Sequence, residues 1–283
     1  MSDQLKALLE ELRAENSLKA WSVIITFFGD SISNRGGAVA AGTVQEVMAA
    51  LNIGSGTVRT ALSRLCKDGW VERTRSGRNS YYRLAERGAT DFAEASARIY
   101  QAPPTICSET GSLYVVVFDP EKPFTEQTLP ESVLLPEQNL LFAQINAATA
   151  RDLQNTGHLI CRIQNNALPE WVSRQLIPEH ITQKYQRLSE CVEVLLKHSI
   201  QSSLEALAIR TLLIHEWRRI RLRHKPLTIS CTNAENADDF CHKQVALLYG
   251  QLTEPSEHWL DTKAQGPNGL LPVSDIVIDS RFR

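Results

Sequence analysis

The chain has 283 residues, of which 43% are hydrophobic and 22% charged, and its formal net charge is -2. This composition is that of folded globular proteins and argues against disordered, collagenous or coiled-coil chains, and the length suggests about two domains, or three small ones. The most apolar stretch, residues 21–28, is far shorter than the ~20 residues that cross a bilayer, and no signal-peptide pattern opens the sequence. We therefore expect a cytoplasmic protein that does not enter the membrane.

Two short helical patterns separated by a tight turn occur within the first hundred residues. Apolar side chains recur at the i, i+3, i+4, i+7 spacing over residues 44–51 and again over residues 58–65. We expect Thr43 and Ser55 to cap these helices and Gly69 to end the second one. Two short helices joined in this way are typical of a helix-turn-helix motif.

The second helix of this pair leaves a face of hydroxyl and cationic side chains that contains no carboxylate. Arginine can bind guanine edges, hydroxyls adapt to bases or phosphates, and lysine suits the phosphate backbone. A solvated helix face is the alternative, but such faces usually carry charges of both signs. The residues expected to contact DNA from this helix are Ser55, Arg59, Thr60, Ser63, Arg64 and Lys67.

A basic hairpin is predicted directly after the helix pair. Residues 70–74 and 80–84 have strand composition, and the segment between them contains Gly and Asn, which favour a turn. Arg75 and Arg78 lie in that segment and are expected to contact phosphate or the minor groove, as the wing of a winged helix does. From residue 55 to residue 90 there are eight basic residues against three acidic ones, so this part of the chain is locally basic although the whole is not.

The remainder of the chain divides into two further sections. Prolines at residues 103–104 interrupt the helical pattern and predict a domain boundary. Residues 112–178 contain strand and helix signals and predict a small α/β domain. Residues 179–283 are mainly helical. We therefore expect three domains, at 17–101, 112–178 and 179–283.

Three helices are predicted in the last section. The first has one apolar face, the second, residues 203–223, is apolar on more than one side, and the third, residues 238–249, is shorter. Residues 266–272 are expected to form a tail. The apolar face of the first helix consists of Ile181, Tyr185, Leu188, Val192 and Leu195.

No metal site or cofactor is predicted. The six cysteines are scattered without zinc spacing, so we expect reduced thiols. His215 and Glu216 resemble the start of a zinc protease helix, but Arg219 stands where the second histidine is required.

Several stretches of the sequence together resemble the PaaX family of transcriptional repressors. Residues 95–102 are similar to the linker helix of that family, and residues 210–219 to its C-terminal helix. The stretches that carry the resemblance in the first hundred residues are Phe28-Gly29-Asp30-Ser31, Arg35-Gly36-Gly37, residues 58–65, Lys67-Asp68-Gly69-Trp70 and residues 77–82.

The resemblance implies an α+β protein with an N-terminal winged helix-turn-helix, a small ferredoxin-like middle domain and a helical C-terminal domain. It also implies a regulator without enzymatic activity that acts as a homodimer on double-stranded DNA. Family members repress genes of phenylacetate catabolism and release the operator when phenylacetyl-CoA binds. A two-fold dimer requires an inverted-repeat operator.

An acyl-CoA effector would require cations beside apolar or aromatic walls, because it carries several phosphates and a flat base. The segment that resembles the C-terminal helix offers such a set, and these effector-binding candidates are Trp217, Arg218, Arg219 and Arg221. A helix end whose cations complement the helix dipole is the alternative interpretation of the same residues.

Two other functions remain open at this point. The strand pattern of residues 113–118 ends at Asp119, as in the metal-binding strand of CRISPR-associated nucleases, although two-metal chemistry needs several converging acidic ligands. A winged helix can also bind protein instead of DNA. Salt dependence separates DNA binding from protein binding, because phosphate contacts release counterions and protein interfaces respond far less.

Overall fold

The computed structural model contains two compact units. Helices and antiparallel sheets occur together, which confirms the expected α+β class. The first unit combines residues 1–101, 188–219 and 243–283, and the second combines residues 102–187 and 220–242. The structure describes residues 18–101, 112–119, 132–135, 140–163, 179–197, 199–223, 237–274 and 281–282.

The division into three domains, at 17–101, 112–178 and 179–283, stays a prediction. Its boundary at residues 103–104 lies outside the described residues.

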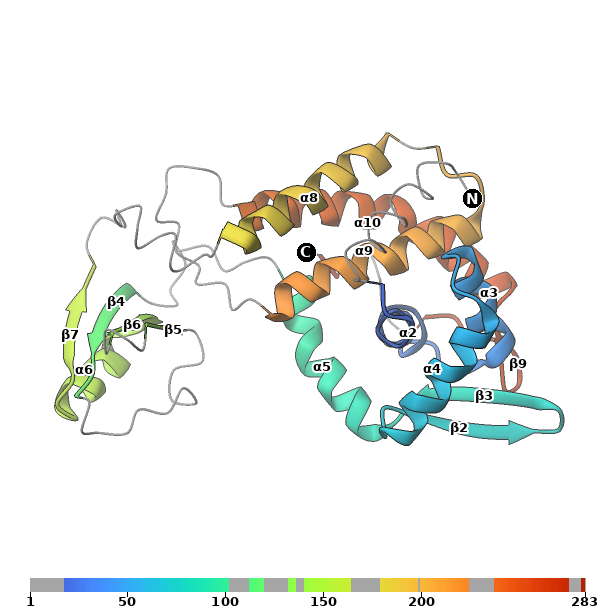
Figure 1. Cartoon of the computed structure of the whole chain (residues 1–283), viewed down its shortest axis with the longest axis horizontal. Helices are drawn as coiled ribbons and strands as arrows, with labels where there is room; N and C mark the ends of the chain where they lie inside the picture. Colours follow the sequence, from blue (N-terminus) through green and yellow to red (C-terminus); the bar gives the residue numbers. More distant parts are fainter. Residues whose placement is uncertain are drawn as a thin grey trace. The chain divides into compact units, whose positions relative to one another are not determined.

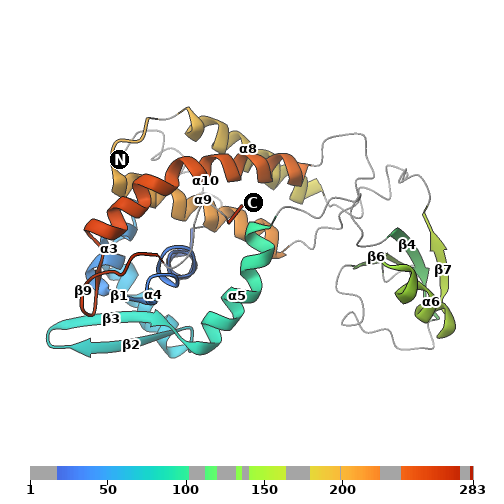
Figure 2. The same cartoon turned by 180° about the vertical axis from the view of Figure 1, so that it is seen from behind.

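A buried helix forms the centre of the first unit. Helix α2 (Ala20–Phe27) continues as the π-helical turn η1 (Phe28–Ile32), and every residue from Ser22 to Ile32 is buried. A helix that is apolar on all sides requires neighbours on all sides. Helices α4, α5 and α9 surround α2 in both views of the ribbon (Figure 1; Figure 2). Gly29 allows α5 (Glu86–Tyr100) to approach, since a Cβ there would lie 1.8 Å from a ring carbon of Phe92.

The predicted helix pair and hairpin are present in the first unit. Helix α3 (Ala41–Ala50) and helix α4 (Ser55–Lys67) are followed by strands β2 (Val71–Ser76) and β3 (Asn79–Leu84). A short strand, β1 (Ala38–Ala40), pairs with β3, so the sheet order is β1-β3-β2. The hairpin turn is tighter than expected, because the strands pair up to Ser76 and Asn79 and Gly77 takes a positive φ of 58° between them.

Both expected helix caps are wrong. Helix α3 begins before Thr43, with Ala40 at its cap position, and α4 begins after Gly54, so that Ser55 is its first residue and Gly54 takes the cap position. Thr43 is buried and its Oγ1 accepts a hydrogen bond of 3.0 Å from the amide of Gln265. A partner 222 positions away in the sequence therefore uses the hydroxyl that a local cap would need.

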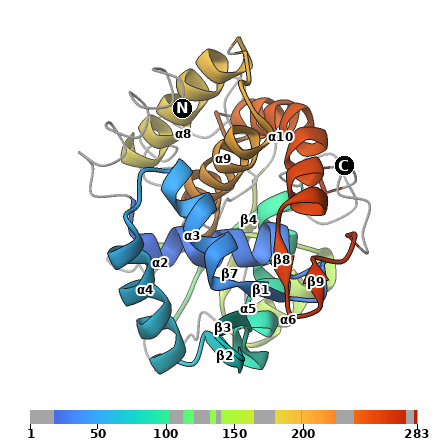
Figure 3. The ribbon, with the colours of Figure 1, turned by 90° about the vertical axis from the view of Figure 1, so that its right-hand side faces the viewer.

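The late helices follow the predicted faces and differ in length. In α8 (Glu179–Leu196) all five predicted apolar positions are buried, and in α9 (Ser203–Arg223) every residue from Glu205 to His215 is buried. Helix α10 (Ala237–Thr262) is longer than the expected 238–249 and continues through Pro255. Residues 265–270 form a small hairpin of β8 (Gln265–Gly266) and β9 (Gly269–Leu270), which lies beside β1 (Figure 3).

The second unit contains a four-stranded antiparallel sheet. The strands are β4 (Ser112–Val117), β5 (Ser132–Leu135), β6 (Leu140–Ile145) and β7 (Leu159–Arg162), in the order β5-β6-β4-β7. Helix α6 (Ala147–Asn155) joins β6 to β7 and is capped by the side chain of Asn146. Ala150 and Leu153 of α6 pack with Val116 and Leu141 in the core of the sheet.

Candidate nucleic-acid interface

Helix α4 divides into a buried side and an exposed side. Val58, Ala61, Leu62 and Leu65 are at most 7% exposed, and they pack this helix on the rest of the first unit, where α2 and α3 contact it. Asn52 takes a φ of 57° in the turn before α4, and Gly69 takes a φ of 72° after it, where the Trp70 amide bonds the Leu65 carbonyl. The turn and the helix end therefore lie where the sequence predicts them.

The opposite side of α4 carries the predicted contact residues. All of them are exposed: Ser55, Arg59, Thr60, Ser63, Arg64 and Lys67. The hydroxyl of Thr60 donates to the Gly56 carbonyl, and Arg64 Nε lies 3.4 Å from Asp68 Oδ2. Asp68 lies just after the helix, so the face has one carboxylate at its edge that the sequence pattern did not include.

The hairpin presents further arginines. Arg75 and Arg78 are exposed, as predicted, and so is Arg73, which sequence reasoning did not single out. The guanidinium of Arg73 lies 5.9 Å from the centre of the Tyr82 ring and donates to Ser80 Oγ. In the register of the hairpin Arg73 is opposite Tyr82 and Arg75 opposite Ser80, so both arginines lie on one face of it.

Strand β2, which carries Arg73, contacts α4. Burial raises the pKa of the Cys66 thiol, and the positive charge of Arg73 partly offsets that increase. Tyr81 and Tyr82 are buried and Trp70 is half-buried, so these aromatic residues pack the hairpin on the rest of the unit. The guanidinium of Arg83 is paired with Glu72 at 2.7 Å, which leaves it less available to a ligand.

One comparison with known proteins matches this same part of the chain. The family model described as PaaX-like protein matches residues 19–88. Over 81 residues the chain is 41% identical to the transcriptional repressor PaaX of Escherichia coli (strain K12). These residues make up 29% of this chain and 26% of that repressor. The N-terminal segment is PaaX-like. The chain thus matches about a quarter of the length of the repressor.

The PaaX-like segment, residues 19–88, contains α2, η1, α3, α4 and the hairpin, and with them all eight predicted DNA contacts. An uncharacterized protein of Mycobacterium tuberculosis has a TM-score of 0.39 at 13% identity, covering 77% of this chain and 91% of that chain. That similarity is too low to bear on the fold.

A buried ionic network fixes the PaaX-like segment to α9 and α10. Asp30 of η1 accepts hydrogen bonds from Arg210 Nε at 2.8 Å, the Tyr100 hydroxyl at 2.7 Å and the Tyr249 hydroxyl at 3.0 Å. Burial alone would raise the pKa of Asp30, but nearby guanidiniums and these hydroxyls outweigh it and hold the pKa below its usual value. The carboxylate is therefore ionised, and it ties η1, the continuation of α2, to α5, α9 and α10.

Glu257 of α10 joins a second arginine to this network. Its carboxylate accepts from Arg210 Nη1 at 2.5 Å and from Arg35 Nη2, and Arg35 also bonds Asp261 at 2.6 Å. Arg35 and Arg210 are almost completely buried. Removing a carboxylate from such a network leaves a buried charge unpaired, which is strongly destabilising.

The four predicted effector residues occupy different environments. Trp217 is fully buried and its Nε1 donates to the Ile99 carbonyl at 2.7 Å. Arg218 donates to the carbonyl and hydroxyl of Ser22, and burial lowers its pKa to about 10, with the charge of Arg219 acting in the same direction. Arg219 is paired with Glu216 at 3.1 Å, and Arg221 is buried. Their role in effector binding stays a prediction.

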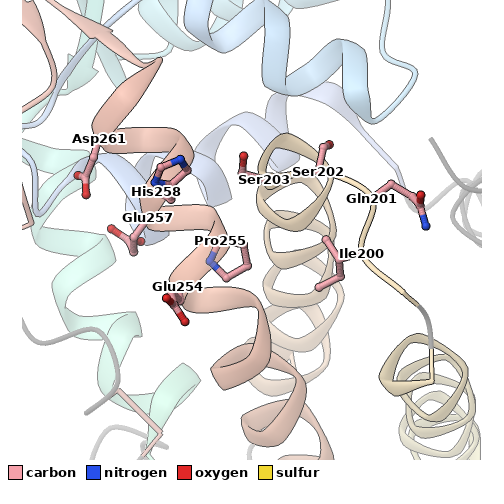
Figure 4. A pocket seen from close by; sticks show the side chains of 9 residues that line it. All are labelled: Ile200, Gln201, Ser202, Ser203, Glu254, Pro255, Glu257, His258 and Asp261. Atoms are coloured by element: carbon pink, nitrogen blue, oxygen red, sulfur yellow. The ribbon is translucent and has the colours of Figure 1, made fainter.

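An open cavity of about 720 Å³ lies in the first unit beside the start of α9 (Figure 4). Glu254, Glu257 and Asp261 line it from α10 together with His258, and Ile200 to Ser203 line it from the other side. Three carboxylates disfavour a ligand that carries phosphates. None of the four predicted effector residues lines this cavity.

Metal-ligating side chains and membrane-spanning helices were also sought over all the described residues. The described cysteines, at 66, 161, 191 and 241, form no disulfide bond with one another. Within the described ranges no group of three or more His, Cys, Asp and Glu side chains could hold a metal ion. Over the same ranges we find no helix with the length and apolar character to span a membrane.

Proposed function

We propose that this chain is a DNA-binding transcriptional repressor of the PaaX type, without enzymatic activity, that acts in the cytoplasm. The observation that carries the proposal is the exposure of eight polar residues, five of them cationic, on α4 and on the hairpin that contacts it within the PaaX-like segment. We call these residues together the α4–hairpin surface, and they are Ser55, Arg59, Thr60, Ser63, Arg64, Lys67, Arg75 and Arg78.

The proposed roles follow from the place of each residue on this surface. We assign α3, α4 and the β2–β3 hairpin to a winged helix-turn-helix, with α4 as the recognition helix. Arg59, Thr60, Ser63 and Arg64 then contact base edges in the major groove, and Lys67 contacts a phosphate. Arg75 and Arg78 contact the backbone or the minor groove from the wing.

The sheet of the second unit is assigned to a ferredoxin-like domain. A β-α-β-β-α-β chain of that type has four antiparallel strands with the first between the third and the fourth, and the second strand at the edge beside the third. The order β5-β6-β4-β7 with α6 between β6 and β7 agrees with this topology.

The regulatory cycle needs a second copy of the chain and a ligand. A homodimer would bind an inverted repeat whose half-sites are about one helical turn, roughly 34 Å, apart or a multiple of it. We propose phenylacetyl-CoA as the releasing effector. It must bind the released state more tightly, because a ligand shifts a conformational equilibrium only by its difference in affinity.

Selection of bound sequences from a random duplex pool, repeated with phenylacetyl-CoA present, tests the proposal. We expect an enriched inverted repeat, elution by the thioester, and an affinity that falls steeply with rising salt. The opposite result is a pool that stays random together with binding that is insensitive to salt. That result would favour a protein-interaction module, and cleavage of the duplexes with magnesium would favour a nuclease.

Two single substitutions separate the roles proposed within α4. Arg59→Ala is expected to cost about 1–3 kcal/mol of binding free energy and to relax the preference at one base position, because a bidentate base contact is lost. Lys67→Ala is expected to weaken all sequences alike and to lower the salt slope by about 1, because one phosphate contact is lost.

Binding titrations of both variants against the selected site and a scrambled duplex, at several salt concentrations, measure the difference. Arg151→Ala provides an exposed arginine control in the second unit. Identical behaviour of the Arg59 and Lys67 variants on the two duplexes would contradict the assignment of their roles.

A further inference from the structure

Arg281, from the far end of the sequence, contacts the same carboxylate as the network described above. Arg281 Nη1 lies 2.6 Å from Asp30 Oδ1 and 2.7 Å from the Asp30 carbonyl oxygen. The Arg281 guanidinium also lies 4.9 Å from the centre of the Tyr100 ring, within range of a cation–π contact. Its side chain is only 9% exposed. These contacts give the Arg281 charge a defined position.

The neighbouring Phe282 covers the two tyrosines that bond Asp30. Its ring centre lies 5.3 Å from that of Tyr100, nearly perpendicular to it, and 5.0 Å from that of Tyr249. Both distances fall in the range of favourable aromatic pairs. Arg281 and Phe282 therefore bind one socket, which consists of Asp30, Tyr100 and Tyr249.

The socket joins the elements that support the α4–hairpin surface. Asp30 belongs to η1, the direct continuation of α2, and α2 packs against α4. Tyr100 ends α5, and Tyr249 lies on α10. A group that fixes Asp30 to both tyrosines therefore fixes the helix on which α4 rests.

Arg281 is more exposed than Arg210, the other guanidinium bound to Asp30, so it can be removed while the rest remains. Without it Asp30 keeps Arg210, Tyr100 and Tyr249 as donors, and Arg210 keeps Glu257. Arg210 and Asp30, by contrast, are completely buried. The contribution of Arg281 to the position of η1 is thus separable from the stability of the core.

We infer that Arg281 and Phe282 form a latch, which positions α2 and α4 by holding η1 against α5 and α10. The latch is a positioning device for the α4–hairpin surface, and only its effect on DNA rests on the proposed function. Its effect on η1 does not depend on any ligand.

Amide hydrogen exchange of the full chain tests the latch directly. In Arg281→Ala and Phe282→Ala we expect the amides of residues 28–32 and 99–100 to exchange about tenfold faster, because the local opening free energy falls. Arg281→Lys should retain most of the protection, since an ammonium group can still donate to Asp30. Arg151→Ala, the exposed control, should leave these amides unchanged. Unchanged exchange in both latch variants would overturn the inference.

Titration of the same variants with the selected duplex tests the positioning role. We expect Arg281→Ala to weaken binding several-fold with the salt slope unchanged, because no phosphate contact is lost. Faster exchange at residues 28–32 with unaltered DNA affinity would overturn the positioning role. If the unaltered protein shows no salt-dependent binding of duplex DNA, the proposed function fails, whereas the exchange result still decides whether the latch exists.

Discussion

Replacing Asp30 with alanine is expected to lower the free energy of unfolding by about 3–5 kcal/mol, the range for breaking a buried ion pair by removing one partner. The carboxylate is completely buried and pairs with Arg210 at 2.8 Å and with Arg281 at 2.6 Å. Without it the Tyr100 and Tyr249 hydroxyls also lose their acceptor. The remaining carboxylate of Glu257 can neutralise only part of the positive charge of Arg210 and Arg281, since it also pairs with Arg35.

Urea unfolding of the full chain, followed by far-UV circular dichroism, measures this loss. Asp68→Ala is a matched control, because it also removes a carboxylate paired with an arginine, but both partners are exposed. Such surface pairs contribute about 0–1 kcal/mol. Equal effects of the two substitutions would show that burial of the Asp30 network contributes nothing to stability.

The same variant should alter the acid dependence of stability. Arginine charges and tyrosine hydroxyls overcome the effect of burial and lower the pKa of Asp30 in the folded protein. A lowered pKa means that the stabilisation is present above the unfolded pKa of about 3.9 and is lost as pH falls through the folded value. Below pH ~4 the difference between the unaltered protein and Asp30→Ala should therefore narrow.

Local sequence patterns predicted helix α4 and the hairpin of the α4–hairpin surface well. The positions of Val58 and Leu65 alone indicate which side of α4 is buried, and the remaining residues then face outward. Gly69 and Gly77 have a positive φ that few other residues adopt, so the helix end and the hairpin turn could also be predicted. These features depend on residues only a few positions apart.

The features that sequence patterns missed depend on distant partners. Thr43 resembles a helix cap, but the amide of Gln265 uses its hydroxyl. Asp30 and Arg210 are 180 positions apart, and Arg35 reaches Glu257 across 222 positions. No periodicity relates such pairs, so one sequence does not show that they meet.

The resemblance had nevertheless marked several of these residues. Asp30 and Arg35 lie in the stretches 28–31 and 35–37, and Arg210 opens the stretch 210–219. Their shared role becomes visible only in the network that joins the PaaX-like segment to α9 and α10. Motif residues far from a predicted DNA contact can thus act by placing the helix that carries the contact.

Trp217→Ala is expected to lower the free energy of unfolding by about 3–5 kcal/mol, the usual range for deleting a buried large aromatic side chain. Trp217 is fully buried in α9, and its indole nitrogen donates to the Ile99 carbonyl at the end of α5. The substitution removes both the packed ring and the partner of a buried carbonyl. Urea unfolding of the full chain measures the combined loss.

Trp217→Phe separates the ring from its hydrogen bond and also tests the effector role predicted for this residue. Phenylalanine keeps much of the apolar volume but leaves the Ile99 carbonyl without its donor, which should cost about 1–3 kcal/mol. A packing role predicts this loss of stability with unchanged affinity for the proposed effector, phenylacetyl-CoA. A ligand wall predicts the reverse, namely near-normal stability and weakened binding of the thioester. The observed burial of Trp217 and its 2.7 Å bond favour the first outcome.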